Sequence, residues 1–285
     1  MKPKISVVIC AHNAARTIEK TLISLKNQVF KDFEIVVAND GSTDDTVKIA
    51  ERYARVINMK KAGLSAARNI GIRNSKADIV AIIDADIEAS KNWLQTIYDG
   101  LKNEVAVTGH TNIPKSTYLG DCISALGYPG GAHLGFQNMW PVDKQGYTIH
   151  MSGGNCGFRK KVIQEIGAFN KELTITGDDA FLSTKILKAG YRIKFLPDMV
   201  IWHEPRKSLK SFIRWHYTRG RGNYLFKKQV KGVNRYIKLR LWSSWNIIKK
   251  YWFTPKIFLI IPLLVISFVA QYVGYISAIR KDSGN

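Results

Sequence analysis

The amino-acid sequence predicts an α/β fold in which a mainly parallel sheet carries helices on both faces. Over residues 5–109, apolar β-branched runs typical of buried strands alternate with helical stretches. Ligands of such sheets bind at the carboxyl ends of the strands, where Asp40 and Asp84 are both expected. We expect strands at 5–10, 34–39, 56–58, 79–83 and 105–109, and helices at 17–28, 46–54, 64–74 and 92–102.

Local patterns support these elements in order. Ile5–Cys10 is a continuous apolar run, as expected for a strand buried on both faces. The segment 17–28 gathers its apolar side chains on one helical face. Capping residues in the polar turn 40–44 precede the helix at 46–54, and Gly63 precedes the next helix.

The sequence after residue 109 is less regular. Residues 110–150 are rich in Gly and Pro and are predicted to form an irregular loop, a common form of lid or substrate loop. Beyond it we expect helices at 160–166 and from Asp178 to Gly190, and short strands at 192–196 and 199–202. The basic remainder is predicted to be helical, with an interruption at 220–222.

Charge divides the chain. The formal net charge is +21, but residues 206–256 contain fifteen Lys or Arg and no Asp or Glu. We therefore expect a front domain at 1–205 and a basic helical segment at 206–256. Such a segment suits nucleic acid or an anionic membrane surface.

The next segment favours the membrane. Residues 257–279 carry no charged side chain and as a helix would be roughly 35 Å long, enough to cross a hydrocarbon core of roughly 30 Å. A buried or interfacial amphipathic helix is the alternative. From the excess of Lys and Arg before this segment, we expect the front domain to lie on the cytoplasmic face of the cell membrane. We expect no nucleic-acid partner.

The cysteines indicate neither a disulfide framework nor a thiolate zinc site. Cys10, Cys122 and Cys156 are few, odd in number and widely spaced, and none forms a C-x-x-C pair. A reducing compartment is the simplest reading.

The chemistry-bearing residues are mostly acids. Asp84-Ala85-Asp86 follows a buried strand, where its carboxylates suit a Mg²⁺ or Mn²⁺ ion that bridges phosphate oxygens; a simple turn or helix cap is the alternative. Asp40 could accept hydrogen bonds from a base or ribose. Mutual repulsion in Asp178-Asp179 favours a proton acceptor, although Asp178 could only cap its helix. His203 could be a metal ligand, or only structural.

Together these features resemble family 2 glycosyltransferases of the GT-A fold, over roughly residues 4–225. The matching stretches are Ile5–Ile9 with Asn13, Asn39–Asp44, Gly63–Asn69, Asp84–Asp86, Gly153–Asn155, Gly177–Asp179 and His203.

The resemblance implies a role for each residue. Asp40 would contact the nucleotide base, Asp84 the ribose or a metal-bound water, and Asp86 the metal. Asp179 would be the general base of a displacement with inversion, with Asp178 beside it as a second catalytic acid. His203 would be a further metal ligand. The other substrate-binding residues would be Asn13, Arg68, Asn155, Arg214 and Trp215.

Two departures from the family pattern matter. The acid pair is Asp-Asp, whereas the family often has Glu-Asp, which puts the acceptor contacts in doubt. Of the Gln-x-x-Arg-Trp stretch of processive synthases, only Arg214 and Trp215 remain. With a single candidate membrane segment, this favours transfer of one sugar over polymer export.

We therefore expect a membrane-associated glycosyltransferase that uses a UDP-, GDP- or dTDP-sugar with Mn²⁺ or Mg²⁺. Its acceptor would be a lipid-linked glycan or a cell-envelope polysaccharide precursor. A membrane-anchored nucleotide-binding module without activity is the alternative. A sugar nucleotidyltransferase is disfavoured because the loop after the first strand, 11–15, lacks Gly. That loop also lacks the G-x-G-x-x-G of a dinucleotide oxidoreductase.

Overall fold

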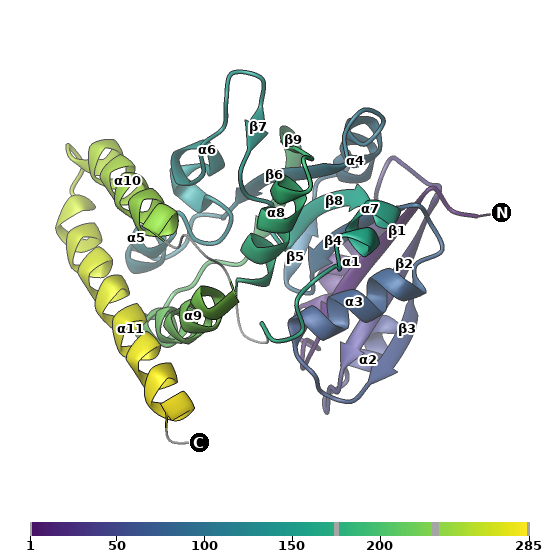
Figure 1. Cartoon of the computed structure of the whole chain (residues 1–285), viewed down its shortest axis with the longest axis horizontal. Coiled ribbons are helices and arrows are strands. Elements are labelled where there is room, and N and C mark those ends of the chain that lie inside the picture. Colours follow the sequence, from purple (N-terminus) through teal and green to yellow (C-terminus); the bar gives the residue numbers. More distant parts are fainter. Residues whose placement is uncertain (1, 174–176, 230–233, 284–285) are drawn as a thin grey trace. The chain divides into compact units, whose positions relative to one another are not determined.

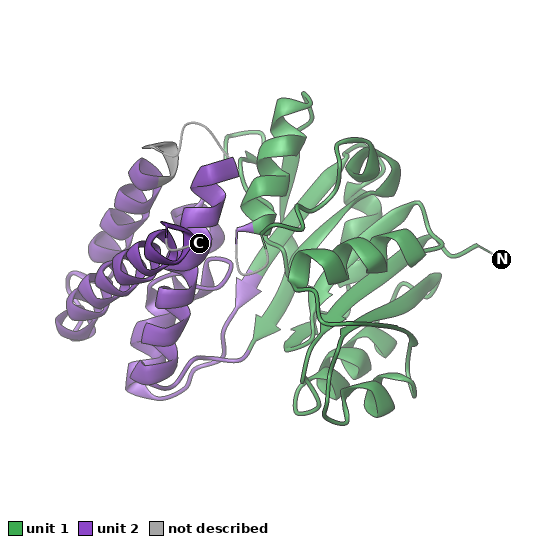
Figure 2. Ribbon diagram, turned by 60° about the horizontal axis from the view of Figure 1, so that its bottom comes forward, with its two compact units in different colours: residues 1–110, 142–174, 178–203 green, residues 111–141, 175–177, 204–285 purple. Residues whose placement is uncertain are grey.

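The computed structural model describes residues 2–173, 177–229 and 234–283. The chain forms two compact units, coloured separately in Figure 2. Unit 1 comprises Met1–His110, Val142–Thr174 and Asp178–His203, and unit 2 comprises Thr111–Pro141, Ile175–Gly177 and Glu204–Asn285. Residues 230–233 of the predicted basic segment lie outside the described residues.

Unit 1 is built on a mixed sheet with the strand order β3-β2-β1-β4-β8-β6-β9-β5, in which β7 also pairs with β9 (Figure 1). Its strands are β1 (Ile5–Ala11), β2 (Phe33–Asp40), β3 (Arg55–Met59), β4 (Ile79–Asp84), β5 (Ile87–Ala89), β6 (Ala106–Asn112, ending in unit 2), β7 (Tyr147–Thr148), β8 (Asn155–Arg159) and β9 (Ile193–His203). Its helices are α1 (Ile18–Lys26), α2 (Thr46–Ala50), α3 (Leu64–Asn74), α4 (Trp93–Gly100), α7 (Lys160–Glu165) and α8 (Asp178–Lys188).

The parallel part of the sheet is its first half. β1 pairs in parallel with β2 and β4, and β2 with β3, whereas β8 is antiparallel to β4 and β6, and β5 and β7 are antiparallel to β9. Side-chain periodicity indicates that a segment is a strand but not in which direction it runs. The sequence pattern therefore could not distinguish the parallel half of the sheet from the antiparallel half.

Both faces of the sheet are covered by helices, as the sequence predicts. Val7 and Ile9 pack into a core with α1 and α4, whereas the intervening Val8 faces a second core that includes residues of α3, α7 and α8. Alternate side chains point to opposite faces of a strand, so a strand buried on both faces must be apolar throughout. This explains the unbroken apolar runs of β1 and β4.

Two predictions after residue 109 are wrong. Residues 110–150 are not an irregular loop, because they contain α5 (Tyr118–Ala125), a 3₁₀ turn (Ala132–Leu134), α6 (Phe136–Met139) and β7, and 111–141 belong to unit 2. Gly131 and Gly135 lie at the two ends of the 3₁₀ turn, and Gly135 also precedes α6. The two short strands near 192–202 are the single strand β9. Its Pro197 lies between the stretches that pair with β7 and β5.

The expected break in the basic helices is also absent. α9 (Leu209–Gln229) continues through Gly220, where an added Cβ would lie 2.0 Å from the carbonyl oxygen of Gln271 on α11 (Ile257–Ser283). Gly220 therefore permits close helix packing and does not end the helix.

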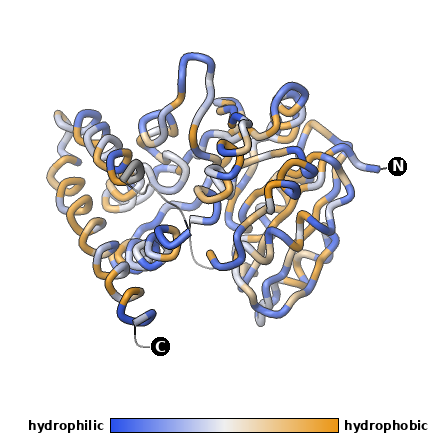
Figure 3. The backbone as a smooth tube through the Cα atoms, in the orientation of Figure 1, coloured by the Kyte–Doolittle hydropathy of each residue, from blue (hydrophilic) through white to orange (hydrophobic). Residues whose placement is uncertain are grey.

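Unit 2 is mainly helical. Its helices include α5, α6, α9, α10 (Asn234–Tyr251) and α11. Its core includes Cys122, Phe212, Ile247 and Ile260. Within the described residues, α11 is the one helix long and apolar enough to cross a membrane. Figure 3 shows its apolar character along most of its length, and only one of its faces is buried.

Candidate active site

The parallel strands bring the first two acids to one edge of the sheet in unit 1. β1 lies between β2 and β4, with Ala11 opposite Asn39 and Cys10 opposite Asp84. Asp40 and Asp84 are thus the last residues of the strands on either side of β1. Their proximity follows from the sheet order, as the sequence predicts.

Asp40 is almost completely buried and holds the loop before α3. Its carboxylate accepts the N–H groups of Ala62 at 2.7 Å and Gly63 at 3.0 Å. Gly63 has a φ of 92°, a conformation that favours Gly, and it immediately precedes α3. Asp40 therefore fixes the start of the helix that carries Arg68.

Asn13 joins two loops at the same edge. Its backbone N–H donates to Ser42 Oγ at 3.0 Å, and its Oδ1 accepts the N–H of Thr43 at 2.8 Å. Asn13 has a φ of 50°, in the left-handed region that Asn tolerates better than most residues. It orders the rim on which the resemblance places the nucleotide.

Arg68 is the centre of the site. Its guanidinium is buried and donates through Nη1 to Asp178 Oδ2 at 2.5 Å and through Nη2 to Asp84 Oδ1 at 3.1 Å. Burial opposes its charge, but Asp178 and Asp84 outweigh burial and raise the pKa of Arg68. In the structure Arg68 connects the strand-end acid to the acid pair on α8, and the substrate contact that the resemblance implies for it stays a prediction.

The two acids of the pair differ in their surroundings. The side chain of Asp178 is 5% exposed, and burial raises its pKa, an effect that Arg68 opposes and Asp179 reinforces. The side chain of Asp179 is 29% exposed and accepts the N–H of Gly153 at 3.3 Å. Of the two, Asp179 is the one that an acceptor can reach.

His150 is a site residue that the sequence did not reveal. Its Nε2 lies 3.8 Å from Asp179 Oδ2, and its side chain is 8% exposed. A lone His in an apparently irregular stretch gives no local signal. The only hint was its place three residues before the Gly153-Gly154 pair.

Gly153 and Gly154 are required by space. A Cβ on Gly153 would lie 2.7 Å from Arg68 Nη1, and one on Gly154 would lie 2.3 Å from Asp84 Oδ2. Any larger residue at either position would push the arginine and the acid apart. The Gly-Gly pair thus allows the chain before β8 to pass directly over the Arg68–Asp84 ion pair.

Asn155, the third residue of that motif, holds elements of the fold together, and its expected substrate contact stays a prediction. It is fully buried; its Oδ1 accepts from Trp93 Nε1 at 2.8 Å, and its Nδ2 donates to the carbonyls of His110 and Met199. Since both amide N–H groups and the carbonyl are engaged inside the fold, Asn155 joins β8, β6, β9 and α4.

Asp86 and His203 form a pair of potential metal ligands, separate from the Arg68 ion pairs. β5 pairs with β9 so that Ile87 lies opposite His203, which sets His203 Nε2 3.4 Å from Asp86 Oδ2. Two ligands at about 2.1 Å from an octahedral metal lie roughly 3 Å apart, so this pair fits two neighbouring positions on Mg²⁺ or Mn²⁺. Within the described ranges, no group of three or more His, Cys, Asp or Glu is arranged to hold a metal ion.

Arg214 and Trp215 lie on α9 in unit 2. Arg214 is exposed, whereas the Trp215 ring packs edge-to-face with those of Tyr128 and His216.

Comparison with known proteins identifies the family and the fold. A model of Glycosyl transferase family 2 matches residues 6–167. The chain belongs to this family. It is therefore a glycosyltransferase that uses a nucleotide-sugar donor.

Curated relatives are also glycosyltransferases. Glycosyltransferase AglE of Haloferax volcanii is 24% identical over 84% of this chain and 80% of its own length. The O-antigen chain rhamnosyltransferase RfbN of Salmonella typhimurium is 24% identical over 73% of this chain and 70% of its own length. Glycosyltransferase GlyA of Streptococcus pneumoniae is 24% identical over 73% of this chain, but the chain spans only 31% of GlyA.

Solved structures share the GT-A fold of this glycosyltransferase. The mannosyltransferase PcManGT of Pyrobaculum calidifontis, in complex with GDP-Man and Mn²⁺, matches with a TM-score of 0.62 and 17% identity over 95% of this chain and 87% of its own. GalNAc-T7 with UDP, GalNAc and Mn²⁺ matches with a TM-score of 0.59 and 19% identity over 85% of this chain and 54% of its own.

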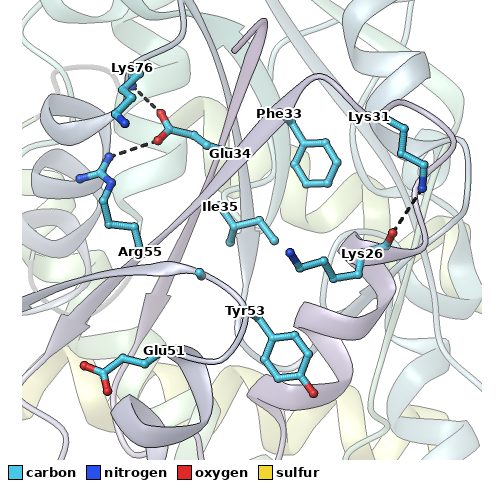
Figure 4. A pocket seen from close by; sticks show the side chains of 10 residues that line it. Lys26, Lys31, Phe33, Glu34, Ile35, Glu51, Tyr53, Arg55 and Lys76 are labelled. Carbon is cyan, nitrogen blue, oxygen red and sulfur yellow. Dashed lines mark hydrogen bonds and ion pairs between the residues drawn. The ribbon is translucent and has the colours of Figure 1, made fainter. Parts of the chain in front are cut away.

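A hollow elsewhere on the glycosyltransferase's unit 1 does not belong to this site. It is lined by residues at the start of β2, including Phe33, Glu34 and Ile35, together with Arg55 and Lys76 (Figure 4). Glu34 there accepts the N–H of Lys76 and a hydrogen bond from Arg55. The site acids lie at the other end of β2, so this hollow is not a donor site.

Proposed function

We propose that this enzyme transfers one sugar, with inversion at the anomeric carbon, from a nucleotide-diphosphate sugar to a hydroxyl of the acceptor. Asp179 is the general base that removes the hydroxyl proton. The observation that carries the proposal is the contrast within the acid pair, since Asp178 is buried against Arg68 while Asp179 remains partly exposed.

The Arg68 network holds the base in place. Asp178 begins α8 and is fixed by Arg68, which in turn is fixed by Asp84 at the end of β4. Asp179, the next residue, also receives the Gly153 N–H. A base held this way approaches the acceptor in one orientation, which supplies the in-line geometry of displacement.

The donor would bind along the carboxyl edge of the parallel strands. Asp40 and Asn13 order the loops that would hold the base and ribose. Asp86 and His203 would hold the divalent metal, and the donor phosphates and water would complete its ligands. When bound, the metal would offset the charge that develops on the departing diphosphate.

The base assignment is tested by Asp179→Asn. Transfer should fall by about 10²- to 10⁴-fold, the usual contribution of a general base, while donor binding is kept. Release of nucleoside diphosphate from a panel of UDP-, GDP- and dTDP-sugars with Mn²⁺ identifies the donor and measures the loss. Asp198→Asn, an exposed acid on β9, is the matched control. Normal turnover of the Asp179 variant would refute the assignment.

The second part of the proposal concerns the location of the enzyme. The packing of α11 supports a helix that lies in the plane of the membrane surface. α9 packs along α11, with Tyr217 bonded to Ser277 at 2.7 Å and Lys228 paired with Asp282 at 2.6 Å. A spanning α11 would draw the charged α9 into hydrocarbon, at a cost of several kcal/mol. The outer side chains of α11 are exposed and apolar: Phe258, Ile261, Val265, Phe268, Val269, Tyr272 and Val273.

An apolar face flanked by basic helices fits an anionic bilayer surface. The proposed acceptor is accordingly membrane-associated, a lipid-linked glycan or an envelope polysaccharide precursor, and the site faces the cytoplasm. RfbN, which is named for the O-antigen chain, supports this acceptor class.

The orientation is tested with anionic vesicles. Val265→Asp should weaken binding several-fold, whereas Val29→Asp, an equally exposed position in unit 1, should not. Alkaline carbonate should release the wild-type protein from membranes. Retention after that treatment would show a spanning helix.

A further inference from the structure

Unit 2 contains a group of arginines packed among aromatic rings. The Arg219 guanidinium lies 4.8 Å from the centre of the Tyr128 ring, and that of Arg240 lies 4.9 Å from the same ring. Arg219 and Arg206 also lie over Trp215, at 4.9 and 4.7 Å. We call this the arginine cluster; its members are Tyr128, Arg206, Trp215, His216, Arg219 and Arg240.

Two of the arginines have buried donors without an acceptor. Nε of Arg219 and both Nε and Nη1 of Arg240 are buried and make no hydrogen bond in the described part of the chain. The partners of Arg240 are hydroxyl groups: Ser267 Oγ lies 3.2 Å from Nη2, and the Tyr128 side chain also hydrogen-bonds to Arg240. Each buried donor without a partner costs about 1–3 kcal/mol, and more when it is charged. These donors need an acceptor.

No carboxylate of the described residues forms an ion pair with Arg219 or Arg240. Between Glu204 and Asp282 the sequence has no acid, and Asp121 is paired with Lys256 at 3.6 Å. Burial lowers the pKa of Arg240; Tyr128 opposes this effect, and the neighbouring positive charge of Arg219 adds to it. Burial and the three arginines lower the pKa of His216 to about 2, so His216 is neutral at pH 7.

We infer that Arg219 and Arg240 form a binding site for a phosphate or diphosphate group carried on a lipid. A phosphate group offers several acceptor oxygens and up to two negative charges, which match two guanidinium groups better than a single carboxylate does. The aromatic rings keep the guanidinium groups in place without neutralising them.

The neighbourhood of the cluster favours a lipid over a free anion. Arg240 also lies 5.2 Å from the centre of the Phe268 ring, and Phe268 is 40% exposed on the outer apolar face of α11. The donors that need an acceptor are thus next to the face proposed to contact the membrane. The lipid assignment rests on the proposed function, and it names the carrier of the acceptor as a lipid phosphate or diphosphate.

The test is ligand binding by the full-length protein, measured without turnover. Farnesyl phosphate in phosphatidylcholine nanodiscs, free pyrophosphate and phosphatidylglycerol nanodiscs are the three probes. We expect farnesyl phosphate to bind and to raise the Tm. Arg219→Gln and Arg240→Gln should each weaken that binding by about tenfold or more, as charged hydrogen bonds are lost. Lys210→Gln, an exposed residue of α9 with the same change in charge, is the control.

The three probes separate the sources of phosphate. Tighter binding of farnesyl phosphate than of pyrophosphate supports the lipid, whereas equal binding would overturn the lipid assignment and leave a free-phosphate site. Preference for phosphatidylglycerol would indicate bulk lipid and overturn the acceptor assignment.

A purely structural role predicts different results. The glutamine variants would then lower the Tm, and no phosphate probe would raise the Tm of the wild-type protein. Hydrolysis of the donor, measured in the same samples, separates the two proposals. Absence of donor hydrolysis by the wild-type protein would count against the proposed function, whereas phosphate binding is judged from the three probes alone.

Discussion

Arg68 in unit 1 and Arg240 in unit 2 are buried arginines with opposite surroundings. Arg68 donates to two carboxylates, Asp178 and Asp84, and these acids raise its pKa. Arg240 has a hydroxyl and two aromatic rings beside it, and burial lowers its pKa. The first charge is balanced within the chain, whereas the second is not.

This difference separates two uses of the same side chain. A guanidinium with its own acids stabilises the fold and positions neighbouring groups, since two carboxylates balance its charge and bind both of its Nη groups. A guanidinium whose buried donors have no acid is costly to the folded protein and is therefore available to an external anion. Unit 1 illustrates positioning and unit 2 illustrates binding.

The largest expected difference is in stability. Arg68→Met should lower the free energy of unfolding by about 3–5 kcal/mol, because it leaves Asp178 buried without its counter-ion. Arg240→Met should change it by less than about 1 kcal/mol, because lost ring contacts are offset by the removal of a buried, repelled charge. Denaturant unfolding measures both, and equal losses would contradict the comparison.

The pH dependence of unit 2 should depend on His216. The unfolded chain binds a proton at His216 near pH 6.5, whereas the folded chain does so only near pH 2, so stability is lost as the pH falls below 6.5. The loss approaches about 1.4 kcal/mol per pH unit, or about 2 kcal/mol at pH 5. Thermal unfolding from pH 7 to 5 measures it.

His216→Gln is the matching variant, because it cannot take up the proton. The free energy of unfolding of this variant should depend less on pH between pH 7 and 5 than that of the wild-type protein. An unchanged slope would place the pH dependence elsewhere.

The smallest effect is expected from two close-packed glycines. Gly154→Ala should displace Asp84 from Arg68 and lower turnover by about tenfold, since a small misplacement of the site costs this much or more. Gly220→Ala should instead separate α9 from α11, costing about 1–3 kcal/mol with the donor affinity unchanged. Donor titration and turnover of both variants distinguish the two regions.

Local pattern was sufficient to predict the acid edge of unit 1. Strand ends are determined by nearby residues, and the sheet order then sets Asp40 and Asp84 on either side of β1. The helix at 64–74 coincides with α3 for the same reason.

Contacts between distant residues could not be predicted. Arg68 meets Asp178 across 110 positions, and His150 approaches Asp179 from a stretch predicted to be irregular. Gly220 predicts a helix break when its neighbours alone are considered, because its packing partner, Gln271, is far away in the sequence. Tertiary packing decided each of these.

The most direct test of the central claim is the anomeric configuration of the product. When the donor found in the panel is used with an acceptor alcohol and Mn²⁺, proton NMR of the first product formed reports that configuration. A single displacement assisted by Asp179 predicts the configuration opposite to that of the donor, and Asp179→Asn should form almost none of it. A product that keeps the donor's configuration would contradict the account.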